Sequence, residues 1–188
     1  MAAKKLIDFT GLVGQFQNHQ QFNDAVIVQL REGGAGGEVV VLDFAKGISE
    51  PSLVSDHLNV SGVSPLMGAN HAIGDRFPVV NEIYEIENSK LPSALHALPR
   101  VVVAGVNEAI NAGDKELTFL KTLGADATCK NIVPTMLVAA HAKKKVLAVL
   151  VPEGQTLSAE LLAIVLSVMF TVPMPAFKTP PPPVSLPS

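Results

Sequence analysis

The pattern of hydrophobic positions along the chain predicts strands that alternate with helices. Runs of valine and leucine bounded by turn-forming or charged residues are typical of strands buried on both faces, and they occur at 38–42, 100–105 and 146–151. A fourth strand is predicted at 52–60. The glycine- and proline-rich stretch 61–78 that follows it is expected to form a long loop.

Helices are predicted where apolar residues recur at every third or fourth position. The predicted helices span 12–31 with a possible break near Asn23, 79–98, 114–123, 134–142 and 157–172. Strands alternating with helices indicate parallel βαβ units, so the fold class is α/β, with a central, mostly parallel sheet flanked by helices. Ligands of such sheets lie beyond the carboxyl ends of the strands, here in the loops that follow Val41, Gly105 and Val151.

The chain is expected to form one domain over 1–176 and a proline-rich tail over 177–188. The four consecutive prolines at 180–183 fix φ and lack N–H donors, so the tail should adopt an extended polyproline II conformation. We expect this tail to lie in a groove on another subunit, because a segment that is already extended loses little entropy on binding.

Composition limits the classes of protein that remain. Of the 188 residues, 48% are hydrophobic and 16% are charged, which supplies a core and excludes a wholly disordered chain. The net charge of -3 gives no electrostatic footprint for nucleic acid or for an anionic membrane. No signal peptide is recognised, and the apolar stretch 157–172 is shorter than the roughly 20 residues that span a bilayer. Together with the single Cys129, these features favour a reducing, cytoplasmic location.

The histidines and the cysteine give no indication of a metal site. His19, His71 and His96 show no ligand spacing with cysteine, aspartate or another histidine, so neither a metal nor a cofactor is predicted. Asp56 precedes His57 and could orient its imidazole as a general base. Cys129 would react only if the pKa of its thiol were lowered, and the sequence gives no cause for that.

A series of motifs in the middle of the chain carries a family resemblance. In chain order they are SDHLN at 55–59, SPLMGAN at 64–70, GDRFP at 74–78, LGADA at 123–127 and the segment 133–141. Their order and co-occurrence resemble the purine nucleoside phosphorylases of the trimeric kind, which cleave inosine and guanosine with phosphate. The resemblance covers about 38–175. It implies a phosphorylase-like fold that lacks the N-terminal strands of the family, and it gives the Asp56-His57 pair a structural role.

Five residues fall at ligand-site positions of that family but differ from the family pattern: Asp43, Phe44, Glu108, Lys130 and Asn131. Phe44 should fill space that a sugar or phosphate would occupy, and Asp43 should repel phosphate. Glu108 could still bind a purine, although we favour a solvated loop acid. Lys130 and Asn131 either replace a ligand contact or face solvent, and we favour solvent. The resemblance also implies an N-terminal phosphate-binding loop of backbone amides, which nothing before Leu42 is expected to supply.

These departures together predict a purine nucleoside phosphorylase-like protein without catalytic residues, acting as a structural or interaction subunit of a larger assembly. Loss of every positioning group should abolish a reaction that depends on positioning and charge stabilisation. Two alternatives stay open: an active, divergent enzyme of purine nucleoside phosphorolysis, and a nucleoside-binding regulator without turnover. The expected partners are other protein subunits or a second copy, since missing strands should expose a sheet edge or an apolar face.

Overall fold

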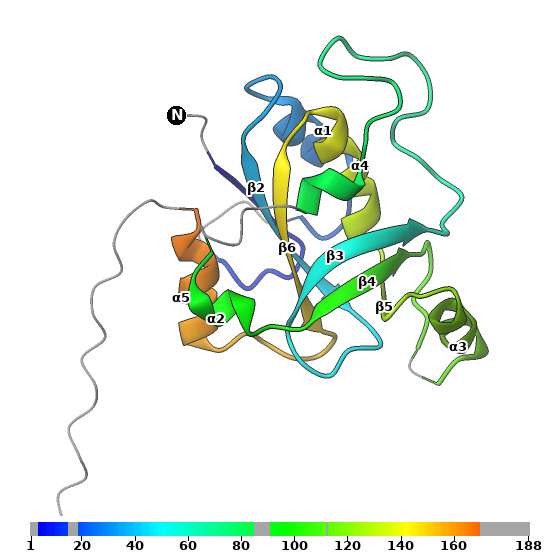
Figure 1. Cartoon of the computed structure of the whole chain (residues 1–188), viewed down its shortest axis with the longest axis vertical. Coiled ribbons are helices and arrows are strands. Elements are labelled where there is room, and N and C mark those ends of the chain that lie inside the picture. Colours follow the sequence, from blue (N-terminus) through cyan, green and yellow to red (C-terminus); the bar gives the residue numbers. More distant parts are fainter. Residues whose placement is uncertain (1–3, 15–18, 85–90, 112, 170–188) are drawn as a thin grey trace, which may run out of the picture.

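A curled, six-stranded sheet forms the centre of the computed structural model, which describes residues 4–14, 19–84, 91–111 and 113–169 (Figure 1). Within these residues, all neighbouring strands pair in parallel except β3 and β6, which are antiparallel. The predicted α/β class with a mostly parallel sheet is therefore confirmed. In spatial order the strands are β1 (Lys5–Asp8), β2 (Glu38–Ala45), β6 (Lys145–Pro152), β3 (Ser52–Asn59), β4 (Arg100–Gly105) and β5 (Ala127–Cys129).

Helices cover both faces of this sheet (Figure 1). One face carries α1, α4 and the short 3-10 helix η1, the other carries α2 and α5, and α3 lies beside β5. Their bounds are α1 (Asp24–Arg31), η1 (Asn81–Tyr84), α2 (Ser93–His96), α3 (Lys115–Thr122), α4 (Ile132–His141) and α5 (Ala159–Ser167). Alternation along β2 explains the two layers, because Val39 and Val41 pack toward α4 whereas Val40 and Leu42 pack toward α5.

The sheet curls until its second strand meets its last one. Lys46, directly after β2, donates its backbone N–H to Thr128 of β5 at 3.0 Å and accepts the Thr128 N–H at 2.9 Å. This bridge brings the carboxyl end of β2 beside β5 and the start of α4. Residues that are distant in sequence thus meet at one end of the sheet.

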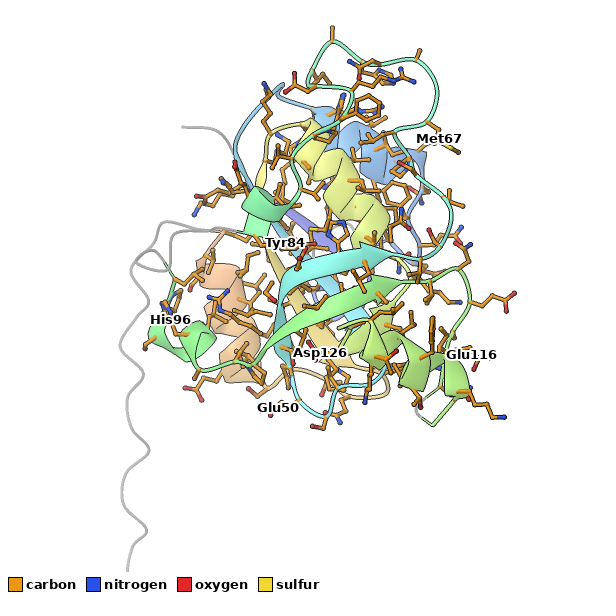
Figure 2. The ribbon with its side chains drawn as sticks, turned by 45° about the vertical axis from the view of Figure 1, so that its right-hand side comes forward. Glu50, Met67, Tyr84, His96, Glu116 and Asp126 are labelled. Carbon is orange, nitrogen blue, oxygen red and sulfur yellow. The ribbon has the colours of Figure 1, made fainter. Side chains whose placement is uncertain are left out.

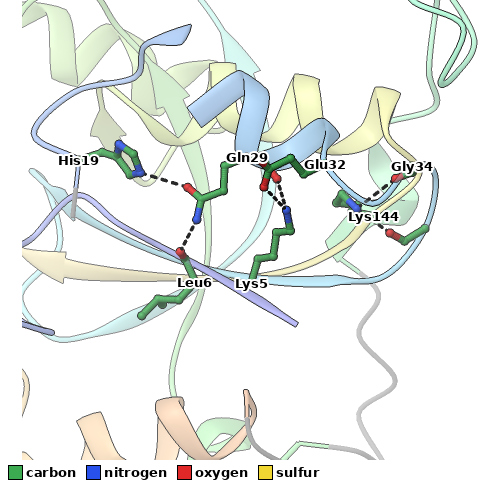
Figure 3. Close-up of polar contacts among 8 residues, drawn as sticks. Lys5, Leu6, His19, Gln29, Glu32, Gly34 and Lys144 are labelled. Atoms are coloured by element: carbon green, nitrogen blue, oxygen red, sulfur yellow. Dashed lines mark hydrogen bonds and ion pairs between the residues drawn. The ribbon is translucent and has the colours of Figure 1, made fainter. Parts of the chain in front are cut away.

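Polar contacts fasten α1 and the loop after it to the edge of the sheet (Figure 3). Gln29 donates to the Leu6 carbonyl at 3.3 Å, while its side-chain oxygen lies 3.1 Å from His19 Nε2. Lys5 donates to the Gln29 carbonyl at 2.6 Å. The Lys144 amine is buried and donates to the Gly36 carbonyl at 2.7 Å, so the glycine-rich turn that precedes β2 wraps around a lysine.

The four predicted strands are present, and β4 has the predicted bounds. Two further strands were not predicted, because β1 and β5 are only four and three residues long and too short for a periodic signal. The predicted helix over 12–31 is wrong for the described residues 12–14 and 19–23, which are not helical, since α1 begins after the Asn23 cap. Residues 10–13 instead wrap around the Asp8 carboxylate.

The predicted helix over 79–98 is also wrong. Only η1 and the four-residue α2 lie within the described part of this range, and Pro92 directly precedes α2. The predicted loop over 61–78 and helix over 114–123 are confirmed. The C-terminal apolar helix begins after the Ser158 cap, as α5. The tail at 177–188 lies outside the described residues, so its position on another subunit stays a prediction.

The long loop between β3 and η1 is anchored at one point on α4. A Cβ on Gly74 would lie 1.7 Å from the His141 carbonyl oxygen, so only glycine permits this approach. Asn70 strengthens the contact, because its side-chain oxygen lies 3.0 Å from His141 Nε2 and its amide donates to the Gly74 carbonyl at 3.2 Å.

A second close approach, between Gly105 of β4 and Val133 of α4, shows how tightly α4 packs on the sheet. A Cβ on Gly105 would lie 2.6 Å from the Val133 side chain, with the β-branched valine unable to move aside. Gly105→Ala should therefore lower the free energy of unfolding by about 1–3 kcal/mol, measured by urea denaturation. Gly14→Ala is the matched control, since its Cβ would meet nothing within 4 Å. Equal midpoints for the two variants would contradict this packing.

Candidate functional site

A cavity of about 520 Å³ lies beyond the carboxyl ends of β3 and β4, against the start of α4. Residues from four segments line it, namely 21–27, 61–65, 105–107 and 130–134. The loop after Gly105 is thus at the predicted place for a ligand. Phe22, Ile27 and Val106 give the cavity an apolar side, whereas Lys130 and Asn107 give it polar groups.

A hydrogen-bonded network joins β2 to the wall of this cavity. The Asp43 carboxylate accepts the Asn131 backbone N–H on Oδ2 and the Asn131 side-chain Nδ2 on Oδ1, both at 3.2 Å. Asn131 Oδ1 in turn accepts the backbone N–H of Phe22 at 2.9 Å. One amide side chain therefore links β2, the start of α4 and the segment that carries Phe22.

Burial controls the charge of Asp43. The residue is only 3% exposed, and this desolvation raises the pKa of its carboxyl to about 7, although hydrogen bonds from Asn131, Phe44 and Ile132 lower the pKa in part. Cys129 lies nearby on β5, where burial and the Asp43 charge raise the pKa of its thiol well above the usual value. The thiol is therefore neutral and unreactive, as predicted.

The structure separates the five predicted site residues. Asp43 and Asn131 are in contact, and the expectation that Asn131 faces solvent is wrong because both ends of its amide are bonded inside the protein. Lys130 is exposed at the cavity, and Glu108 is exposed but does not line it. Phe44 packs toward α5 on the opposite face of the sheet and takes up no part of this cavity. Side chains alternate along a strand, so Phe44 and Asp43 cannot share a face.

A second buried carboxylate, which the sequence reading missed, ends β1. Asp8 is fully buried and accepts the backbone N–H groups of Thr10 at 2.8 Å, Gly11 at 3.1 Å and Val13 at 3.0 Å, as well as the Thr10 hydroxyl at 2.6 Å. The amides of this loop therefore surround a carboxylate of the chain itself. An aspartate that ends a short apolar run and stands two residues before Thr-Gly is the signal that could have revealed it.

His57 does not form an acid-base pair with Asp56. The Asp56 carboxylate accepts the backbone N–H of His57 at 2.7 Å, whereas the His57 ring lies 2.6 Å from the Tyr84 hydroxyl through Nδ1. Burial lowers the pKa of His57 and raises the pKa of Tyr84. The ring and the hydroxyl thus connect β3 to η1 as a structural contact.

Two kinds of feature are absent from residues 4–14, 19–84, 91–111 and 113–169, namely a cluster of metal ligands and a helix that could span a membrane. No three side chains of His, Cys, Asp or Glu gather there in a way that could hold a metal ion. Within the same residues, no helix is long and apolar enough to cross a membrane.

No protein-family model matches the chain. The similar curated proteins nevertheless agree with one another in kind. The chain is 32% identical over 132 residues to purine nucleoside phosphorylase 1 of Bacillus subtilis, covering 67% of this chain and 46% of that protein. It is 30% identical over 152 residues to purine nucleoside phosphorylase 1 of Geobacillus stearothermophilus, covering 72% and 55%. The chain thus spans about half the length of these relatives.

A solved structure shares the fold. Schistosoma mansoni purine nucleoside phosphorylase, in a complex with BCX-34, matches with a TM-score of 0.72 and 17% sequence identity over 92% of this chain and 91% of that one. The curled sheet with its flanking helices therefore belongs to the nucleoside phosphorylase class of α/β folds. Taken with the sequence matches, the chain belongs to the purine nucleoside phosphorylase family.

The protonation of Asp43 should be visible in the pH dependence of stability. Its pKa is about 7 in the folded protein and near 3.8 ordinarily, so the folded state holds the extra proton between these values. The contribution of this group to the free energy of unfolding should therefore fall as pH rises from about 4 to 7. The free energy of unfolding of Asp43→Asn relative to the wild type should therefore rise by up to about 1.4 kcal/mol per pH unit across this range. Urea unfolding at several pH values measures the difference.

The exposed acid Glu108 offers a control for this titration. Glu108→Gln removes an exposed carboxyl that does not line the cavity and is the matched control variant. If Asp43→Asn runs parallel to the wild type, the carboxyl of Asp43 is not held protonated by burial.

Proposed function

We propose that this purine nucleoside phosphorylase-like protein does not carry out phosphorolysis and acts through contacts with other protein subunits. The observation that carries the proposal is the Asp43 carboxyl group, buried at the start of α4 beside the cavity. Phosphate needs N–H donors or cations, yet the Asn131 donors are already bonded to this carboxyl. In its ionised form, Asp43 would also repel phosphate.

The Asp8 loop supports the same proposal independently. The resemblance implies that phosphate is held by backbone amides near the N-terminus. Here, the backbone N–H groups of Thr10, Gly11 and Val13 all donate hydrogen bonds to the Asp8 carboxylate. A bound anion would have to displace a fully buried carboxylate from four hydrogen bonds, and each hydrogen bond to a charged group contributes about 1.5–3 kcal/mol.

An apolar surface supports a role in protein contacts. Met67 is 72% exposed and Phe77 is 86% exposed, both on the long loop between β3 and η1, and Val63 and Val79 of the same loop are also exposed. Figure 2 shows Met67 on the outer side of this loop. Met67 and Phe77 line one surface pocket together, and exposed apolar side chains that lie close to each other are typical of sites that bind another protein. The proposed partner is a second copy or a different subunit, in a reducing intracellular compartment.

Absence of phosphorolysis is the direct test. The purified chain should release no hypoxanthine from inosine and no guanine from guanosine in the presence of phosphate, beyond the rate without protein. A chromatographic assay of the free base measures this. Release of either base above that rate would overturn the proposal and establish the alternative, an active divergent enzyme.

Self-association can be tested at the loop surface. Wild-type protein at micromolar concentration should have a mass above the 19.8 kDa of one chain by light scattering. Phe77→Asp should shift the mass toward that of the monomer, because a charge at the centre of an apolar contact is costly to bury. Phe119→Asp is the matched control, since Phe119 is 61% exposed on α3, outside the loop. A wild-type chain that is a stable monomer would exclude a second copy as partner.

Nucleoside binding without turnover is the second candidate, and the cavity favours it. Its volume of about 520 Å³ is within the range of small-molecule sites, and it combines the Phe22 ring with the Lys130 amine. Inosine or guanosine should then raise the melting temperature in proportion to the logarithm of its concentration, and Lys130→Ala should weaken that effect. A melting temperature unchanged at millimolar nucleoside would exclude this function.

A further inference from the structure

The Asn131 side chain is a two-ended link whose orientation depends on its partners. Its Nδ2 donates to Asp43 Oδ1 at 3.2 Å, and its Oδ1 accepts the Phe22 N–H at 2.9 Å. An ionised carboxylate only accepts and a backbone N–H only donates, so these two groups fix which way the amide points. The carboxylate form of Asp43 therefore selects the orientation that holds Phe22.

Phe22 occupies a part of the cavity wall that is attached at a few points. Upstream, the His19 N–H donates to the Asp8 carbonyl at 2.7 Å. Downstream, the Asn23 side chain caps α1. Between these two points, the bond from Phe22 to Asn131 joins the segment to α4. Gln21 and Phe22 both line the cavity, so loss of this bond frees part of its wall.

A proton on Asp43 reverses this arrangement. Oδ2 faces the backbone N–H of Asn131, and Oδ1 faces the Phe44 N–H and the Asn131 side chain. The added proton needs an acceptor. The backbone N–H groups cannot accept it, whereas the Asn131 side chain can, by turning its oxygen toward the protonated acid. That rotation places Nδ2 against the Phe22 N–H, and two donors cannot bond.

We propose that protonation of Asp43 releases the Phe22 wall of the cavity by turning the Asn131 amide. The cavity is the one proposed to bind a nucleoside, and the regulatory role of this release rests on that proposed function. Burial sets the pKa of Asp43 at about 7, so both forms are populated near neutral pH.

Other charged groups around Asp43 do not explain such a transition. Cys129 on β5 faces Asp43, but burial keeps its thiol neutral. On the neighbouring strand β6, the residue in register with Asp43 is the apolar Leu150. On β1, Asp8 is in register with Leu42 and therefore lies on the opposite face of the sheet from Asp43. His19 is the titratable side chain of the cavity-wall segment in the described residues, and it therefore serves as a control.

A tryptophan reporter tests the proposal, because the chain contains no tryptophan. In Phe22→Trp, the emission maximum should move to longer wavelength as pH falls from 8.5 to 5.5, with a midpoint near 7 and an unchanged circular dichroism spectrum. Adding Asp43→Asn should abolish the transition. Adding Asn131→Ala should give the low-pH emission at every pH, whereas adding His19→Gln should leave the transition intact.

A transition that persists with Asp43→Asn, or that disappears with His19→Gln, would overturn the proposal. Hydrogen exchange in the unmodified protein gives an independent answer if a variant fails to fold. After correction for the intrinsic exchange rate, protection of the Phe22 amide should fall at least tenfold between pH 8 and pH 6, and unchanged protection would refute the release. Neither readout depends on turnover, so a finding of active phosphorolysis would leave this test unaffected.

Discussion

Lys46 and Thr128 exchange two backbone hydrogen bonds, and these bonds hold the curled sheet closed between β2 and β5. An open sheet would leave the end of β2 far from α4. In the curled sheet, Asp43 lies against the first amides of α4, and the cavity forms beyond the ends of β3 and β4. Gly105 makes this geometry possible, because the absence of a side chain lets Val133 of α4 rest directly on β4.

Asp8 and Asp43 show how this small domain accommodates buried acids. Asp8 gathers the amides of one tight loop on one face of the sheet, and Asp43 meets the start of a helix on the other face. Burying a carboxylate is unfavourable unless donors replace its water. Asp8 accepts four such bonds, whereas the bonds to Asp43 only partly offset its burial, which raises the pKa of Asp43 to about 7. The same residue type thus fastens a loop at one site and changes charge near neutral pH at the other.

Sequence patterns were informative where the physical signal is local. The valine run of β4 predicts its bounds because a strand buried on both faces needs a continuous apolar segment. The prediction of a helix over 79–98 was wrong because it relied on the apolar spacing and gave too little weight to Pro92, which directly precedes the short α2. Alternation along β2 could have placed Phe44 and Asp43 on opposite faces, but the family resemblance put both at ligand positions. The contact between Asp43 and Asn131, however, joins residues 88 positions apart and depends on the curl of the sheet, which no local pattern encodes.

The anchoring of the long loop on α4 has a consequence for recognition. Gly74 rests on the His141 carbonyl, and Arg76 donates to the Gly68 carbonyl at 3.0 Å, so the loop is divided into shorter spans. A short tethered span samples fewer conformations than one free loop of the same total length. Phe77 and Met67 are therefore presented from a backbone that has already lost much of its conformational freedom during folding. A partner that binds these side chains would immobilise less of the chain, and more of the contact energy would remain as affinity.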